Sequence, residues 1–185
     1  MEREAAGLKL KLGEKAPYFS LRGTDNRIYS IADFASAPAL VVIFTCNHCP
    51  YAQAYETRLI DLAREFQPRG ARFVAVCAND SNSFPEDDFD HMVEKSRSLD
   101  LPFPYLQDEF QVMARAYDAA CTPELFLFDD KQELRYHGRV DDNHRDPTLV
   151  TRQDLREALT AVLKGQAPEV ALTPALGCSI KWKRL

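Results

Sequence analysis

The stretch Thr45-Cys46-Asn47-His48-Cys49-Pro50 directly follows the apolar run Ala39-Leu40-Val41-Val42-Ile43-Phe44. The run shows no alternation of apolar and polar residues, which is typical of a strand that is covered on both faces. Two cysteines separated by a two-residue spacer can close a small disulfide ring. The stretch therefore predicts a redox site at the end of a buried strand.

The predicted chemistry of the pair depends on where the next helix begins. If the helix begins at Asn47, the Cys46 thiol lies over the unpaired N–H groups and the positive end of the helix dipole, which favour the thiolate. His48 adds a positive charge or a hydrogen-bond donor beside the same sulfur. Because a stabilised thiolate makes the disulfide more oxidising, we expect Cys46, Cys49 and His48 to form the reactive centre.

Composition indicates an ordinary globular protein. The chain has 185 residues, of which 45% are hydrophobic and 28% charged, and its formal net charge is -5. We assign residues 1–185 to a single domain, with a core at 14–165 and a C-terminal tail at 166–185. The charge gives no reason to expect nucleic acid or a membrane surface as a partner. Charges interrupt the apolar residues of segment 1–11, which is unlike an export signal, so we expect a cytoplasmic location.

The five cysteines are odd in number and dispersed apart from one pair, which favours redox chemistry over a disulfide framework. A zinc site at Cys46 and Cys49 would need a second ligand pair, and His137 and His144 lie far away without ligand spacing, so we expect no metal and no cofactor. The sequence favours inert or structural roles for the other thiols except Cys121, whose role stays open. The acidic clusters at 86–90 and 141–142 are interpreted as solvated.

The pattern of the chain alternates strands with helices and ends in a strand pair followed by a helix. A capping box at 108–111 predicts a short helix that buries Phe110, Met113, Ala114 and Tyr117. In the tail, Ile180 and Trp182 indicate that an otherwise irregular segment docks on the fold. The other expected elements are a hairpin at 16–22 and 27–31, strands at 39–45, 71–77, 125–128 and 134–140, and helices from 50 to about 68, from 83–86 to 99, and at 151–164.

This order resembles the thioredoxin superfamily, and the N-terminal hairpin is similar to its peroxiredoxin-like branch, the alkyl hydroperoxide reductase and thiol-specific antioxidant (AhpC/TSA) group, with the related bacterial thiol-disulfide oxidoreductases. Four motifs carry the resemblance: Cys-Asn-His-Cys-Pro-Tyr from Cys46, Pro-Glu-Asp from Pro85, Thr-Pro from Thr122, and Gly-Cys-Ser-Ile-Lys-Trp from Gly177. The resemblance implies an α/β, thioredoxin-like fold: a central mixed sheet covered by helices, with an extra N-terminal β-hairpin and an irregular C-terminal tail.

The resemblance also implies residue roles. Cys46 becomes the attacking thiolate and Cys49 the resolving thiol, and Thr122-Pro123 becomes a cis peptide that faces the disulfide and pairs through its exposed backbone with an extended substrate. Asn47 and Cys121 are the neighbouring candidates for substrate contact. Leu40 stands where thioredoxins carry a buried acid, so proton transfer to Cys49 needs water, His48 or another acid.

Two departures bear on the choice between a peroxidase and a dithiol exchanger. Peroxiredoxins polarise peroxide with a threonine three residues before the reactive cysteine and with an arginine before the Phe-x-x-Asp strand. Cys46 and the segment Thr122-Pro123-Glu124 stand in those places. We therefore expect a thiol-disulfide oxidoreductase that acts on disulfide-containing proteins or small-thiol disulfides and is served by an upstream thiol reductant. A peroxidase working through a sulfenic acid and a redox-sensing binding module remain alternatives, and the oligomeric state stays open.

Overall fold

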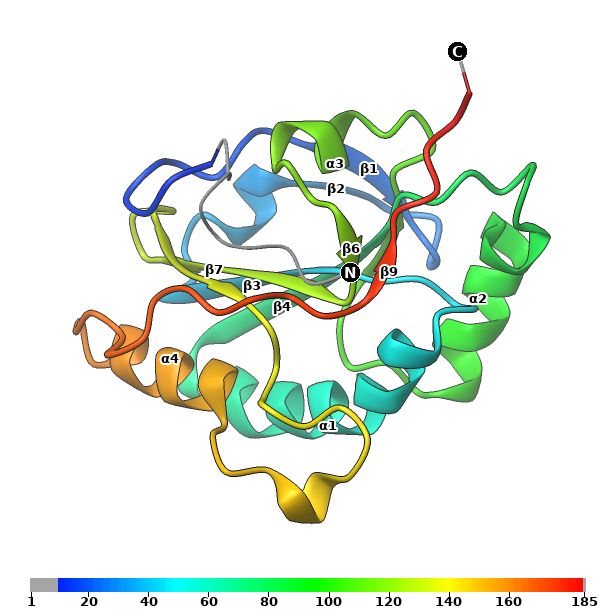
Figure 1. The fold of residues 1–185 in the computed structure, drawn as a ribbon. Coiled ribbons are helices and arrows are strands. Elements are labelled where there is room, and N and C mark those ends of the chain that lie inside the picture. The colour runs from blue at the N-terminus through cyan, green and yellow to red at the C-terminus, as the bar shows by residue number, and fades with distance from the viewer. Residues whose placement is uncertain (1–9, 185) are drawn as a thin grey trace.

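A seven-stranded mixed sheet, in the order β2-β1-β5-β4-β3-β7-β8, runs through residues 10–184, which are the residues that the computed structural model describes (Figure 1). Most of segment 1–11, on which the expected cytoplasmic location rests, lies outside these residues. The strands are β1 Ser20–Gly23, β2 Ile28–Ser30, β3 Ala39–Phe44, β4 Ala71–Cys77, β5 Tyr105–Gln107, β6 Cys121–Thr122, β7 Glu124–Asp129, β8 Leu134–Gly138 and β9 Cys178–Ser179. The α-helices are α1 Pro50–Phe66, α2 Phe89–Ser98, α3 Val112–Ala116 and α4 Asp154–Leu163.

The central strand β3 is buried along its whole length, as its unbroken apolar sequence predicted. It runs parallel to β4 and antiparallel to β7. Leu40, Val42 and Phe44 pack on one side of the sheet, whereas Val41 and Ile43 pack on the other. Because both neighbours are hydrogen-bonded to β3, the end of this strand is a rigid support for the residues that follow.

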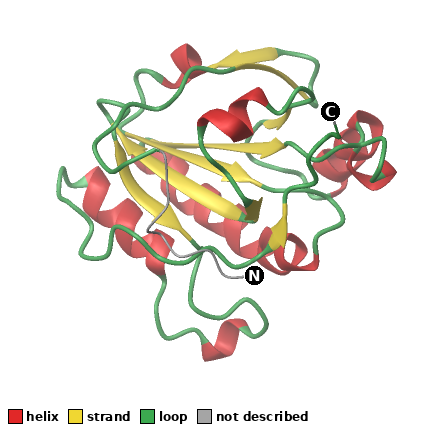
Figure 2. Ribbon diagram, turned by 45° about the horizontal axis from the view of Figure 1, so that its top comes forward, coloured by secondary structure: helices red, strands yellow, loops and turns green. Residues whose placement is uncertain are grey.

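Helices cover both faces of the sheet. Buried side chains of α1, α4 and α2 share one cluster with Val41 and Ile43, whereas α3 contributes to the cluster on the opposite face. Figures 1 and 2 show α1 and α4 together on one side of the sheet and α3 on the other. The mixed sheet between helices is the α/β, thioredoxin-like arrangement expected from the sequence, with the β1–β2 hairpin at one edge.

The helices after β4 differ in detail from the prediction. Residues Pro85–Asp87 form a single 3-10 turn, and α2 begins only at Phe89, because Asp88 is extended and caps the helix by accepting from His91 N–H. Strand β5 was not predicted. It joins the hairpin to β4 and extends the sheet by one position.

The predicted capping box at 108–111 has another geometry. Gln111 is left-handed at φ 59° and precedes α3, and the Asp108 carboxylate reaches past it to accept from the N–H groups of Val112 and Ala114. Phe110 is 76% exposed, so its prediction as a core residue was wrong. The Gln111 bend turns Phe110 out of the helical face that Met113, Ala114 and Tyr117 bury.

The tail docks on the fold, as predicted. Its main chain bonds to His137 in β8 through Ala171 and Thr173, and β9 then pairs with β6. Figure 1 shows this segment crossing from α4 to β6. Ile180 is buried in the cluster beneath α3. Within residues 10–184, no helix has the length and apolar character needed to cross a membrane.

Candidate redox site

Cys46 and Cys49 lie between the end of β3 and the start of α1, and both are buried, with exposed fractions of 2% and 0%. Helix α1 begins at Pro50, with Cys49 as its N-cap. The helix expected from residue 50 is confirmed, and the condition for a thiolate at Cys46, a helix that begins at Asn47, is not met. The physical reason is that the N–H groups of Asn47 and His48 point away from the helix to the Asp87 carboxylate. The positive end of α1 consequently favours an anion at Cys49 rather than at Cys46.

The surroundings of the two sulfurs separate their acidities. A hydrogen bond from Cys46 is the main cause that lowers the pKa of Cys49, with further help from Thr122, Cys178 and the Ala52 N–H, against the opposing effect of burial. The pKa of Cys46 is raised, first because its thiol proton is held by Cys49 and then by burial and the charge of Asp87. These directions favour the thiolate at Cys49 and the protonated thiol at Cys46.

The wall opposite the pair is the cis peptide Thr122-Pro123, as the resemblance implied. Cys46 Sγ lies 3.4 Å from Thr122 Oγ1, and Cys49 Sγ lies 3.1 Å from the Thr122 carbonyl oxygen. The carbonyl accepts from Cys49 only when that thiol is protonated, so it opposes the groups that favour the thiolate. Because those groups are several and include the helix N-terminus, we assign the thiolate to Cys49.

The backbone at Thr122 is not exposed, contrary to expectation. It is paired with Cys178 of β9, so the position predicted for an extended substrate is filled by the tail. Neighbouring Cys121 is buried, and its sulfur lies 3.8 Å from Glu124 Oε2. The structure thus brings Thr122 and Pro123 to the redox pair, while Cys121 contacts the glutamate behind this wall.

Asp87 is a site residue that sequence reasoning missed, because the acids at 86–90 were interpreted as solvated. It is only 1% exposed. Its Oδ1 accepts from Asn47 N–H at 2.7 Å and from His48 N–H at 3.3 Å, and its Oδ2 accepts from the Asn79 side chain at 2.8 Å. Asp141 is likewise buried and accepts from Arg58. Only the Pro-Glu-Asp motif hinted at Asp87, and it did not identify which acid turns inward.

His48 is oriented by the same carboxylate. Its Nδ1 lies 2.6 Å from Asp87 Oδ2, and its ring stacks on Phe84 with 4.9 Å between the ring centroids. A ring nitrogen of His48, Cys46 Sγ and an Asp87 oxygen lie within 4.8 Å of one another. Since Nδ1 bonds to Asp87, Nε2 is the ring nitrogen that remains for a second partner. These three groups number fewer than the four ligands of a structural zinc site, and Asp87 already accepts from four N–H groups.

Asn47 supports the loop instead of facing a substrate. Its side chain donates to the Glu86 carbonyl at 2.7 Å and accepts from the Tyr105 hydroxyl at 3.0 Å, both of which hold it inside the fold. Its own carbonyl accepts from Lys95 Nζ. The expected substrate contact of Asn47 is therefore not what its surroundings show.

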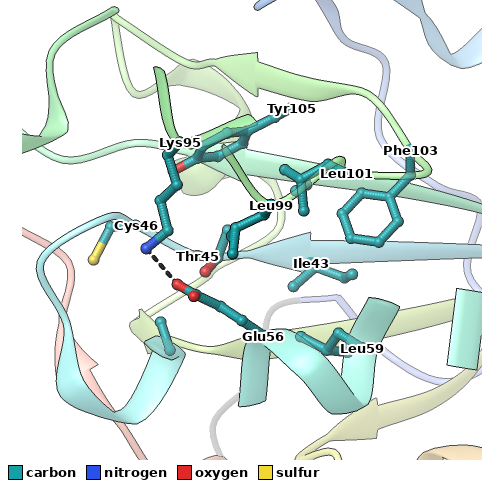
Figure 3. A pocket seen from close by; sticks show the side chains of 12 residues that line it. Ile43, Thr45, Cys46, Glu56, Leu59, Lys95, Leu99, Leu101, Phe103 and Tyr105 are labelled. Atoms are coloured by element: carbon teal, nitrogen blue, oxygen red, sulfur yellow. Dashed lines mark ion pairs between the residues drawn. The ribbon is translucent and has the colours of Figure 1, made fainter. Parts of the chain in front are cut away.

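A cavity of about 40 Å³ lies beside Cys46 (Figure 3). Its lining is mostly apolar, and the ion pair between Lys95 and Glu56 lies at the end nearest the cysteine. The lining residues drawn and labelled are Ile43, Thr45, Cys46, Glu56, Leu59, Lys95, Leu99, Leu101, Phe103 and Tyr105. This cavity has room for a few water molecules beside the pair.

Comparisons with known proteins agree with this fold. The chain is similar over its whole length to an uncharacterized conserved protein from Geobacillus kaustophilus, with 37% identity, a TM-score of 0.91 and 97% of that chain covered. The thioredoxin domain of a thiol-disulfide oxidoreductase from Bacteroides vulgatus has a TM-score of 0.58 at 15% identity, over 68% of this chain and 86% of that chain. The latter likeness concerns the fold alone.

Sequence relatives point to the peroxiredoxin-like branch. Peroxiredoxin Q, chloroplastic, from Oryza sativa subsp. japonica is 27% identical over 101 residues, which are 55% of this chain and 43% of the relative. The chain therefore spans less than half the length of this curated relative. The AhpC/TSA family model matches residues 12–137. The chain thus belongs to the AhpC/TSA family, within the thioredoxin superfamily.

Proposed function

We propose that this protein is a thiol-disulfide oxidoreductase that exchanges electrons through a redox disulfide between Cys46 and Cys49. The observation that carries the proposal is the meeting of the two thiols with the cis peptide Thr122-Pro123, where Cys46 Sγ lies 3.4 Å from Thr122 Oγ1 and Cys49 Sγ lies 3.1 Å from the Thr122 carbonyl oxygen. The family consists generally of redox enzymes of the thiol oxidoreductase and peroxiredoxin kinds. A disulfide of a small thiol is the substrate class that best suits the buried pair.

The reaction follows from the two acidities. The Cys49 thiolate attacks one sulfur of a substrate disulfide, so that a mixed disulfide forms and one thiolate leaves. Cys46 then gives up its proton, to His48 or to the departing thiolate, and attacks Cys49. The second substrate thiol leaves, and the Cys46–Cys49 disulfide carries the two electrons' worth of oxidation. An upstream thiol returns the pair to the reduced form. This order exchanges the roles that the resemblance gave to the two cysteines.

Peroxide reduction is the second candidate, and the position of Cys49 at the start of α1 favours it. A sulfenic acid formed there would condense with Cys46, which releases water and closes the same disulfide. Against it, Cys46 fills the place of the activating threonine. Glu124, in the segment where the arginine is expected, is a buried carboxylate that accepts from the N–H groups of Ala120 and Cys121. We therefore rank dithiol exchange first.

The test compares two oxidants on the reduced protein. Glutathione disulfide should convert the wild type to the Cys46–Cys49 disulfide, which peptide mapping identifies. Cys49→Ser should react at least about 100-fold more slowly, because it lacks the thiolate that attacks. If hydrogen peroxide closes the disulfide much faster than glutathione disulfide does, and oxidises Cys49 to sulfenic acid on the way, the peroxidase takes precedence. If Cys49→Ser instead accumulates glutathione on Cys46, then Cys46 is the attacking thiol and the proposed order of attack is wrong.

A further inference from the structure

The C-terminal tail lies directly against the wall of the redox site. Strand β9 pairs antiparallel with β6, so that Cys178 lies opposite Thr122, and Ile180 N–H donates to the Ala120 carbonyl at 2.9 Å. Gly177 is in such close contact that a Cβ there would come within 2.0 Å of the Thr122 carbonyl oxygen. The tail therefore pairs with β6, where an extended substrate was expected to bind, and its close approach depends on Gly177.

More anchors hold the tail beyond β9. Lys181 N–H donates to the Asn79 side chain at 2.8 Å, and the Lys181 carbonyl accepts from Asp80 N–H at the same distance. Asn79 also donates to Asp87, the acid that holds the loop between the two cysteines. The tail and the redox loop are thus anchored to the same residues, so the fold holds Cys178 in a defined position beside the site.

Cys178 completes a group of three thiols. It packs against the cluster that contains Cys46 and Cys49, and it lies opposite Thr122, whose carbonyl oxygen is 3.1 Å from Cys49 Sγ. Burial, followed by the neighbouring Cys49 sulfur, raises the pKa of Cys178 to about 11, which favours a protonated Cys178 beside Cys49. Cys178 is also the only one of the five cysteines that is not fully buried.

We infer that Cys178 is a third redox thiol, which exchanges with the Cys46–Cys49 disulfide and carries its oxidation to the surface; this inference rests on the proposed function. Cys178 attacks Cys49, the bond between Cys49 and Cys178 forms, and the bond to Cys46 breaks. Cys46 leaves with the electron pair and takes up a proton equivalent to the one lost by Cys178. The number of disulfides is unchanged, so this step needs no further oxidant.

The acidities favour reduction from outside at Cys178. An external thiol that attacks Cys178 expels Cys49, and a low-pKa thiolate is the better leaving group. Cys178 is the most exposed sulfur of the three, so a disulfide that includes it offers an external thiol the most accessible point of attack. Its partner is a reducing thiol such as glutathione.

The decisive variant is Cys46→Ser, in which Cys178 is the only neighbour able to resolve Cys49. After treatment with glutathione disulfide, Cys46→Ser should release two glutathione thiols per chain and contain a Cys49–Cys178 disulfide. Cys46→Ser/Cys178→Ser should stop with one glutathione bound to Cys49. Cys77→Ala, which removes a buried thiol outside the group, serves as the matched control and should behave as the wild type. If Cys46→Ser keeps its glutathione and Cys178 stays open to alkylation, the inference is overturned.

Two further measurements separate this inference from the proposed function. Reduced glutathione should reduce the oxidised wild type at least about tenfold faster than oxidised Cys178→Ser, because the accessible sulfur is gone. Gly177→Ala should still close the Cys46–Cys49 disulfide but lose the Cys49–Cys178 disulfide. If the wild type forms no Cys46–Cys49 disulfide, the proposed function fails. If it forms one and Cys178→Ser is reduced at the wild-type rate, only the role of Cys178 fails.

Discussion

Two buried carboxylates, each paired with a histidine, flank the redox pair from opposite walls. Asp87 and His48 hold the loop that carries the cysteines, with 2.6 Å between Oδ2 and Nδ1. Glu124 and His137 stand behind the cis peptide, with 2.7 Å between Oε1 and Nε2. The side chain of His48 is 22% exposed, whereas that of His137 is 4% exposed. The pairs look alike in geometry and differ in their access to protons.

This difference in exposure indicates a catalytic role for the Asp87–His48 pair and a structural role for the Glu124–His137 pair. His48 has one nitrogen bonded to Asp87, a ring nitrogen within 4.8 Å of Cys46 Sγ, and a partly exposed side chain, so we expect it to transfer protons between the pair and solvent. His137 is sealed, and its main chain holds Ala171 and Thr173 of the tail. Glu124 meanwhile caps the turn before Thr122. The first pair should act on rates and the second on stability.

The largest effect is expected from Glu124→Ala. The change leaves two buried N–H groups and His137 without their acceptor, and breaking a buried pair in this way costs about 3–5 kcal/mol in the free energy of unfolding. Urea denaturation of the reduced protein measures it. Glu133→Ala is the matched control, since that glutamate makes a partly exposed ion pair with Arg135 and should cost less than about 1 kcal/mol. Equal losses in the two variants would contradict the structural role of Glu124.

Asp87→Asn should follow. The amide keeps the shape but has one oxygen for the four N–H groups that the carboxylate accepts, and hydrogen bonds to a charged group contribute about 1.5–3 kcal/mol each. We expect a loss of about 3 kcal/mol in unfolding free energy together with slower disulfide exchange. Asp90→Asn, which changes an exposed acid nearby, is the control and should alter the unfolding free energy by no more than about 0.5 kcal/mol. An Asp87→Asn variant with wild-type stability and exchange rate would contradict the role of this carboxylate in holding the redox loop.

Local patterns were sufficient for most of the fold. The apolar run of β3, the spacing of α1 and the Thr-Pro before β7 are short-range signals, and each element formed where its signal lay. The start of α1 was also readable, because proline is favoured at the first position of a helix and thereby makes Cys49 the cap. The choice of Cys46 as the thiolate rested on a helix start at Asn47 and on the resemblance, and it overlooked that signal.

The rest of the site depends on contacts between distant residues. Asp87 lies forty residues from Asn47, and nothing in a run of acids tells which one turns inward. The tail was expected to dock, yet its pairing with Thr122 depends on Gly177 meeting a carbonyl group, which no periodic pattern encodes. Sequence therefore predicted which residues are chemically able to react, and the fold decided which of them meet.

The two histidines provide the most direct comparison. His48→Gln should slow exchange with glutathione disulfide by about 100-fold, the low end of what a general acid or base contributes. The unfolding free energy should change by less than about 1 kcal/mol, because the glutamine amide can replace the ring N–H that donates to Asp87. His137→Gln should do the reverse, with a loss of about 2 kcal/mol and an unchanged exchange rate. Stopped-flow kinetics and urea denaturation of both variants test this. If both variants lose rate and stability together, the separation between the two walls is wrong.

The smallest effect concerns the thiolate itself. Because the pKa of Cys49 is lowered, first by the hydrogen bond from Cys46, the reduced protein should hold a thiolate at neutral pH and lose it only as the pH falls through that lowered pKa. The thiolate stabilises the folded protein fully above pH about 8.5, the pKa of a cysteine in the unfolded chain. This stabilisation is lost as the pH falls through the lowered pKa of the folded state.

Cys46→Ala removes the main donor to Cys49, so the thiolate absorbance should appear only at higher pH, closer to about 8.5. Ultraviolet titration of the reduced proteins measures the shift, with Cys77→Ala as the control because its thiol, whose burial raises its pKa, lies outside the group of three. Cys178→Ala should move the step in the same direction but by less, since Cys46 is the stronger donor. A step that stays in place in Cys46→Ala would mean that the start of α1 alone holds the charge, and the two walls would then matter only for which molecules reach Cys49.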